Sequence, residues 1–411
     1  TGKTFTLPNN VLLTGNGAIS VNRNLSGGGS SNNIAFNKLT LGSSTLTLSS
    51  GNTYTPQFNS VQLMGVATFN PASGANTTLL NVTDSGAGLP MIKNGGGYLL
   101  FSGSQSLSGG AWVNADGTPA FSGGVYVNPS AQLRFSSVTS QAGIGNIVLN
   151  LGGAMQLDAL SQINTAAGQK VEVRSTANSL GTVTLAATLD PTTISAGSIF
   201  TSASTGLLVI GSSSANMLNL ANFGDGSFQL AGAITYAGSL GAGAGSLYRV
   251  GGNATTLTLS GTNALTGANR AVIGSLLSPG NVTITGGSNN YTGGTTVARG
   301  STLTVSSGTT AATSAVGTGA VDVFGTLALT GSWASVANGG TLNLHPGASL
   351  TMAYVLGGGT DRLADGSPLA LDGSNITLTG AAGGTLYEST GTLNFTRGSR
   401  ITTTGGTLAL T

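Results

Sequence analysis

Three carboxylates form the densest group of possible metal ligands in the sequence. Asp361, Asp365 and Asp372 lie close together in a Gly-rich segment and flank Arg362. Carboxylate and backbone carbonyl oxygens are the ligands that Ca²⁺ prefers. The segment lacks both the EF-hand pattern and the Gly-Gly-x-Gly-x-Asp nonapeptide repeat. A calcium site at these three aspartates is therefore one hypothesis, and a solvated loop with an aspartate contacting Arg362 is the alternative.

The chain has a single histidine, His345, at the point where a short apolar alternation ends in Pro-Gly. Any Ser-His-Asp triad would have to use this residue. No Gly-x-Ser-x-Gly elbow stands between a predicted strand and a predicted helix, as that nucleophile requires. We therefore expect His345 to be an exposed turn residue.

The other carboxylates do not form a catalytic group. Polysaccharide lyases and glycosidases need clustered carboxylates on one face. Here they are isolated along the chain, at Asp84, Asp116, Asp158, Glu172, Asp190, Asp225, Asp322 and Glu388. The sequence thus predicts a protein that is not an enzyme and holds no cofactor, and a polysaccharide-degrading enzyme is the weakest of the functions considered.

Charge is scarce throughout the chain. Asp, Glu, Lys and Arg make up 6% of the 411 residues, where about 25% is usual, and the formal net charge is +2. Arginines such as Arg249, Arg270 and Arg299 are widely spaced, without the clustering that nucleic-acid binding requires. Cysteine is absent, which excludes disulfides and thiolate chemistry. We expect no nucleic-acid partner and no membrane-spanning segment.

Short strands are the only elements that this sequence predicts. Pairs of apolar residues at alternate positions, ended by Gly or Asn, recur from Leu39-x-Leu41 to Leu408-x-Leu410. Alternation with period 2 buries one face of a strand and exposes the other. Gly, Ser, Thr and Asn interrupt every window in which a helical period could develop.

The strands recur as copies of one unit. Leu99-x-Phe101-Ser102-Gly103 returns as Leu257-x-Leu259-Ser260-Gly261, and the pairs that begin at Val321 and Leu342 are 21 residues apart. Repeats of this length predict a right-handed parallel β-helix with about 20–25 residues per coil. We expect one continuous solenoid over residues 1–411, with loops leaving it near 56–90 and 356–368.

A motif in residues 291–303 resembles the autotransporter-associated β-strand repeat of bacterial autotransporter passengers. The motif predicts an aromatic residue at the end of a strand, a Gly-Gly corner, an inward strand and a second turn. Its residues are Tyr291, Gly293, Gly294, Val297, Gly300 and Leu303. A degenerate copy has Phe121, Gly123, Gly124, Val127 and Leu133, with Ser130 in place of the second-turn glycine. This is a fold motif, and the resemblance implies a secreted or cell-surface bacterial β-helix without specifying an activity.

Two functions follow as expectations. The first is a structural rod that forms or decorates a bacterial surface fibre, sheath or stalk. Copies of this rod could assemble head to tail. The second is an adhesin, or passenger, that binds glycans or neighbouring cells. The chain begins Thr1-Gly2-Lys3 without a signal sequence, so we expect any such signal to have been removed and the protein to be extracellular or at the bacterial surface.

Overall fold

In a computed structural model, the chain is an all-β parallel β-solenoid of about 13 turns with roughly 24 residues per turn. The predicted parallel β-helix is confirmed, and the turn length falls within the predicted range. The structure describes residues 3–22, 32–102, 112–113, 119–120, 124–127, 132–135, 146–306, 315–331, 334–336, 340–354, 362–363 and 365–410. Among these residues, no helix is long and apolar enough to cross a bilayer.

The chain forms two compact units. The first comprises Thr1–Leu189 and Ile194–Gly206, and the second comprises Asp190–Thr193 and Leu207–Thr411. The expectation of one continuous solenoid over residues 1–411 stays a prediction.

The first unit contains two parallel series of strands and a short antiparallel pair. One series has β1 (Thr4–Leu7), β2 (Val11–Leu13), β4 (Asn33–Leu41), β6 (Thr55–Leu63), β8 (Thr77–Leu80), β9 (Val82–Thr83), β11 (Tyr98–Ser102), β15 (Gln132–Phe135), β17 (Ala154–Leu157) and β19 (Thr182–Leu185). The other has β3 (Gly17–Val21), β5 (Thr45–Ser50), β7 (Ala67–Pro71), β10 (Met91–Lys93), β14 (Gly124–Val127), β16 (Asn146–Leu149) and β18 (Val171–Val173). The antiparallel pair is β12 (Trp112–Val113) with β13 (Pro119–Ala120), and two 3₁₀ turns are η1 (Leu160–Gln162) and η2 (Thr165–Ala167).

The second unit also has two parallel series of strands. We call one the front series: β20 (Leu207–Ile210), β22 (Gln229–Ala231), β25 (Leu247–Val250), β27 (Arg270–Ile273), β29 (Thr295–Val297), β31 (Val321–Val323), β33 (Leu342–Leu344), β35 (Leu369–Leu371) and β37 (Leu393–Phe395). The side series is β23 (Thr235–Tyr236), β26 (Thr256–Leu259), β28 (Asn281–Ile284), β30 (Thr302–Val305), β32 (Thr326–Leu329), β34 (Ser349–Ala353), β36 (Asn375–Glu388) and β38 (Arg400–Leu410). The remaining elements are β21 (Leu218–Asn219), which pairs with β24 (Leu240–Gly241), and the 3₁₀ turns η3 (Pro191–Thr193) and η4 (Leu220–Asn222).

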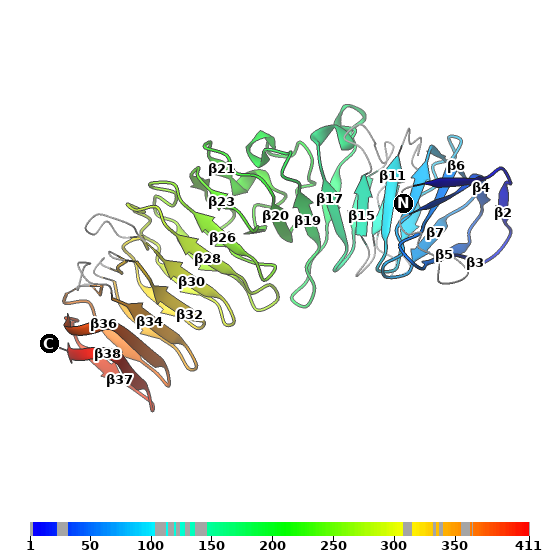
Figure 1. Cartoon of the computed structure of the whole chain (residues 1–411). Coiled ribbons are helices and arrows are strands. Elements are labelled where there is room, and N and C mark those ends of the chain that lie inside the picture. Colours follow the sequence, from blue (N-terminus) through cyan, green and yellow to red (C-terminus); the bar gives the residue numbers. More distant parts are fainter. Residues whose placement is uncertain are drawn as a thin grey trace. The chain divides into compact units, whose positions relative to one another are not determined.

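The alternation of apolar and polar residues explains these coils. In β30, Leu303 and Val305 are buried while Thr302 and Thr304 face outward, as the period of 2 requires. Each strand pairs in parallel register with the strand one coil before and one coil after it, so that β26, β28, β30, β32 and β34 lie side by side (Figure 1). Inward side chains therefore stack into ladders, of which one is Leu259, Ile284, Val305, Leu329 and Met352.

One interior ladder of the first unit contains a charged residue. Lys93 lies in register between Phe69 of β7 and Val127 of β14, and its side chain is fully buried. The Nζ atom donates hydrogen bonds to the backbone carbonyls of Asn94 and Gly95, at 2.5 and 2.8 Å. Burial lowers the pKa of this ammonium group to about 7, because the charged form loses its hydration.

The segment 56–90, which we expected to leave the coils as a loop, is instead mostly strand. It contains nearly all of β6 together with β7, β8 and β9. Pro56 and Pro71 take buried places within β6 and β7. The other expected loop, 356–368, falls largely outside the described residues; within its described part, Leu363 forms a parallel bridge with Val336.

Candidate binding surface

One corner of the second unit gathers most of its exposed charge. Turns connect the front strands from β25 to β37 to the side strands that follow them, at residues 251–255, 274–280, 298–301, 324–325, 345–348, 372–374 and 396–399. Backbone hydrogen bonds hold successive turns in line, from Phe324 N to Val297 O, from His345 N to Val323 O and from Asp372 N to Leu344 O, each of 2.9–3.0 Å. We call these turns, with the adjoining outward side chains of the front strands and Arg400 at the start of β38, the charged corner.

Asp322 is the centre of a polar cluster on this surface. Its Oδ1 accepts a hydrogen bond from Asn343 Nδ2 at 3.0 Å and lies 3.2 Å from Nε2 of His345. Its Oδ2 forms an ion pair with the guanidinium of Arg270 at 3.6 Å, and the same guanidinium donates to Thr296. The side chains of Asp322 and His345 are 27% and 32% exposed, so the cluster is open to a ligand from solvent.

An aromatic pair stands beside this cluster. The rings of Phe324 and His345 are stacked, with centroids 3.9 Å apart and planes inclined by 5°. Phe324 is 37% exposed, although most phenylalanines of the described chain are buried. The stack fixes the imidazole between a carboxylate on one side and an apolar ring on the other.

Positive charge exceeds negative charge along the corner. Arg397 pairs with Asp372 at 2.9 Å, while the exposed guanidinium groups of Arg299 and Arg400 make no hydrogen bond or ion pair with any described residue. Four arginines, counting Arg270, thus face two aspartates, an excess of two positive charges among these six side chains. Such a surface can donate several hydrogen bonds to an anion and can accept a few from hydroxyl groups.

The His345–Asp322 contact resembles two members of a catalytic triad, but the third member is missing from its surroundings. Among the residues that the structure describes, no serine or threonine hydroxyl hydrogen-bonds to His345. The pair lies on an outward face, where water competes for every polar group. Both side chains of the pair are partly exposed and within reach of a ligand from solvent.

The predicted calcium ligands are only partly described. Asp361 lies outside the described residues, Asp365 is exposed in a turn, and Asp372 is occupied by Arg397. Within the described ranges, no group of three or more His, Cys, Asp or Glu side chains is placed to hold a metal ion. The calcium hypothesis therefore stays a prediction.

The repeat motif spans two corners of the second unit, with Gly293 and Gly294 before β29 and Gly300 in a turn of the charged corner. Tyr291 is fully buried, its hydroxyl lies 2.5 Å from Thr295 Oγ1, and its ring meets that of Tyr248 edge to face at 6.4 Å. Gly293 and Gly294 form the turn that follows, where a Cβ on either would come within 2.7 Å of a backbone carbonyl oxygen. Val297 and Leu303 are buried in β29 and β30, with Gly300 in the turn between them.

Only part of the degenerate copy is described. Phe121 and Gly123 lie outside the described residues, whereas Gly124 and Val127 are the ends of β14. Leu133 is fully buried in β15.

A second charged group, which the sequence did not indicate, lies inside the unit. The buried carboxylate of Glu388 accepts hydrogen bonds from the backbone N–H groups of Arg362 and Leu363, at 3.1 and 2.6 Å, and from the hydroxyl of Tyr354. The Arg362 guanidinium lies 4.7 Å from the centre of the Tyr354 ring and donates to the carbonyls of Ala334 and Gly331. This group fastens residues of separate coils together.

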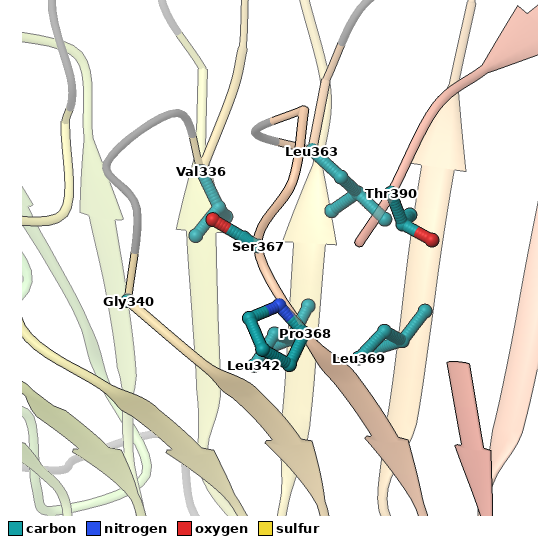
Figure 2. Close-up of a pocket in the computed structure, with 8 residues that line it drawn as sticks. All are labelled: Val336, Gly340, Leu342, Leu363, Ser367, Pro368, Leu369 and Thr390. Atoms are coloured by element: carbon teal, nitrogen blue, oxygen red, sulfur yellow. The ribbon is translucent and has the colours of Figure 1, made fainter. Parts of the chain in front are cut away.

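A small hollow lies next to that group (Figure 2). Val336, Leu363 and Leu369 contribute apolar walls, and Ser367 has a buried hydroxyl without a hydrogen-bond partner in the described chain. Its volume of about 10 Å³ has room for about one water molecule. The hollow is too small for an organic substrate.

The sequence contained one usable signal for the polar cluster. Asp322 and His345 are 23 residues apart, which is about one coil, so the predicted turn length places them on neighbouring coils.

Comparison with models of protein families, with curated proteins and with solved structures finds no match to the chain. The chain is a parallel β-solenoid with a charged corner on its second unit.

Proposed function

We propose that this chain is a non-enzymatic structural protein of the bacterial exterior, a β-solenoid that forms or decorates a surface fibre, sheath or stalk. The observation that carries the proposal is an apolar ladder that runs unbroken through six successive front strands: Val250, Ile273, Val297, Val323, Leu344 and Leu371. All six side chains are at least 96% buried. A stack of this kind is a stiff element, because each coil is held by its two neighbours.

The surface chemistry supports the same role. Thr, Ser and Asn line the outward positions, so water solvates the coils through hydroxyl and amide groups and only a few charges. The resemblance of residues 291–303 to the autotransporter-associated repeat supports a place at the bacterial surface.

Self-association into fibres is part of this proposal. Neighbouring coils already associate through parallel backbone pairing and a shared apolar ladder, as Leu344 and Leu371 show. Coils of separate copies that stacked end to end would use the same two interactions.

Electron microscopy of the native material tests the structural role. Continuous fibres with an axial repeat of about 4.8 Å are the expected result, since that spacing separates neighbouring β-coils. Particles that stay single at high protein concentration would contradict self-association, and native material found only inside cells would contradict the surface role.

A second candidate function is adhesion, and the charged corner is the observation that favours it. In a chain with so few charges, four arginines, a histidine and an exposed aromatic ring on one row of turns form a distinctive surface. Binding of the purified chain to intact cells, lost when this surface is altered, is the measurement that separates adhesion from a purely structural role.

A further inference from the structure

We propose that the charged corner binds an anionic polysaccharide whose chain runs along the row of turns. This inference rests on the surface role proposed above and names the ligand class for its adhesive form. The ligand class is a flexible carbohydrate polymer that bears carboxylate or sulfate groups.

The first argument is the regular spacing of the turns. Each coil contributes one turn to the row, and neighbouring parallel coils are separated by about 4.8 Å. The hydrogen bonds from Phe324, His345 and Asp372 to the preceding front strands keep these turns in register. Side chains on the row are therefore presented at short, regular intervals, as a linear polymer of repeating units requires.

The second argument is charge complementarity. Arg299 and Arg400 are exposed and make no ion pair within the described chain, so both are available to ligand anions. Arg270 keeps 45% of its side chain exposed while it contacts Asp322. A guanidinium group recognises carboxylate and sulfate by parallel N–H···O hydrogen bonds.

The third argument distinguishes a polysaccharide from a nucleic acid. Asp322 and Asp372 lie within the row, where they would repel closely spaced phosphates. Duplex DNA carries about one negative charge per 1.7 Å, a density that this mixed surface does not match. Sugar hydroxyl groups, in contrast, can donate hydrogen bonds to the two carboxylates and to the amide oxygen of Asn343.

The fourth argument is the apolar part of the row. The Phe324 ring is 37% exposed, and Leu276 and Leu277, in the turn of residues 274–280, are 77% and 43% exposed. The C–H face of a pyranose ring packs on such surfaces while its hydroxyl groups reach the neighbouring polar side chains. Exposed apolar side chains on the same row as unpaired arginines fit a ligand that has both apolar C–H faces and anionic groups.

The test measures binding of the purified chain to four polymers by biolayer interferometry: polygalacturonate, dextran sulfate, neutral dextran and duplex DNA. We expect binding to polygalacturonate or dextran sulfate, weaker binding as salt increases, and none to neutral dextran. The two polyanions identify whether carboxylate or sulfate is preferred. Failure to bind either of them, or DNA binding of equal strength, would overturn the inference.

Variants locate the site. Arg299→Gln combined with Arg400→Gln is expected to weaken binding about tenfold, which corresponds to the loss of two exposed charge contacts. The control, Lys3→Gln combined with Lys38→Gln, removes two positive charges from the other unit and is expected to change affinity less than twofold. Equal losses in both double variants would show general charge attraction and would also overturn the site.

Phe324→Ala separates the apolar contact from charge. We expect it to weaken binding several-fold at every salt concentration, with circular dichroism unchanged. An unaltered affinity would exclude ring packing and contradict the proposed mode of binding. If the protein forms fibres but binds no polysaccharide, this inference fails and the structural role stands. If it binds polysaccharide but is not found at the surface, the proposed function fails and the binding site stands.

Discussion

Lys93 pairs in register with Phe69 across β10 and β7, and both side chains are fully buried inside the first unit. A charged group in an apolar row is costly when it has only carbonyl partners. Its pKa of about 7, below the ordinary value of 10.5, means that the unfolded chain binds this proton more tightly than the folded one. Stability should therefore rise as pH increases from about 7 to 10.5, with the full cost present below pH 7.

Lys93→Met removes that cost while keeping the volume of the side chain. We expect the variant to be more stable than the parent chain by a few kcal/mol below pH 7, since each pKa unit corresponds to about 1.4 kcal/mol. The gain should shrink as the pH approaches 10. Urea denaturation at pH 6, 8 and 10 measures this, with Lys38→Met, whose partly exposed amine donates to Gln62, as the control. A gain that does not depend on pH would contradict the lowered pKa.

Gly294 and Gly300 should differ in their response to alanine. Both have positive φ, at 87° and 77°, but a Cβ at Gly294 would lie 2.6 Å from the carbonyl oxygen of Ala320, whereas at Gly300 the nearest atom is 3.4 Å away. Gly300→Ala should cost about 1 kcal/mol from backbone strain alone. We expect Gly294→Ala to cost at least twice as much, as measured by thermal unfolding. Gly398→Ala, with open space around its Cβ, serves as the control, and equal costs at 294 and 300 would rule out the clash.

Tyr291→Phe tests the buried hydroxyl of the repeat motif. The change leaves Thr295 Oγ1 without its partner in a buried position, so we expect a loss of about 1–2 kcal/mol in the free energy of unfolding. The control is Tyr98→Phe, because the Tyr98 hydroxyl makes no hydrogen bond with the described residues and its loss should matter by less than about 0.5 kcal/mol. Similar effects of the two changes would show that the contact contributes nothing.

Glu388→Gln tests the buried carboxylate. One carboxylate serves the N–H groups of Arg362 and Leu363 and the hydroxyl of Tyr354, whereas an amide has a single acceptor oxygen and places an NH₂ group against donors. We expect a loss of about 1–3 kcal/mol by chemical denaturation. Asp365→Asn, at an exposed turn, is the matched acid-to-amide change and should be nearly neutral.

The sequence predicts the coils well because each coil repeats one local rule. Leu303 and Val305, two positions apart in β30, lie inward as the alternation requires. The same rule fails for Lys93, because a lysine at an alternate position is normally assigned to the outward face. The expectation of a loop near 56–90 was wrong in the opposite direction, since the chain forms strands there and Pro56 and Pro71 are buried within them.

The charged corner was harder to predict, because its parts are distant in the sequence. Arg270 and Asp322 are 52 residues apart and meet only because two intervening coil steps bring their strands together. The register of individual coils varies by a few residues, as the steps from Leu259 to Ile284 and from Ile284 to Val305 show. A mean coil length therefore identifies neighbouring coils without specifying which side chains touch.

The contact between Asp322 and His345 joins two adjacent coils, and this has a consequence for how such genes can diversify. Insertion or deletion of whole coils preserves the ladders, because every coil offers the same edges to its neighbours. A coil inserted between β31 and β33, however, would move the two side chains apart by another 4.8 Å or so and abolish the pair. These two coils must be duplicated or exchanged as one block if the cluster is to survive recombination.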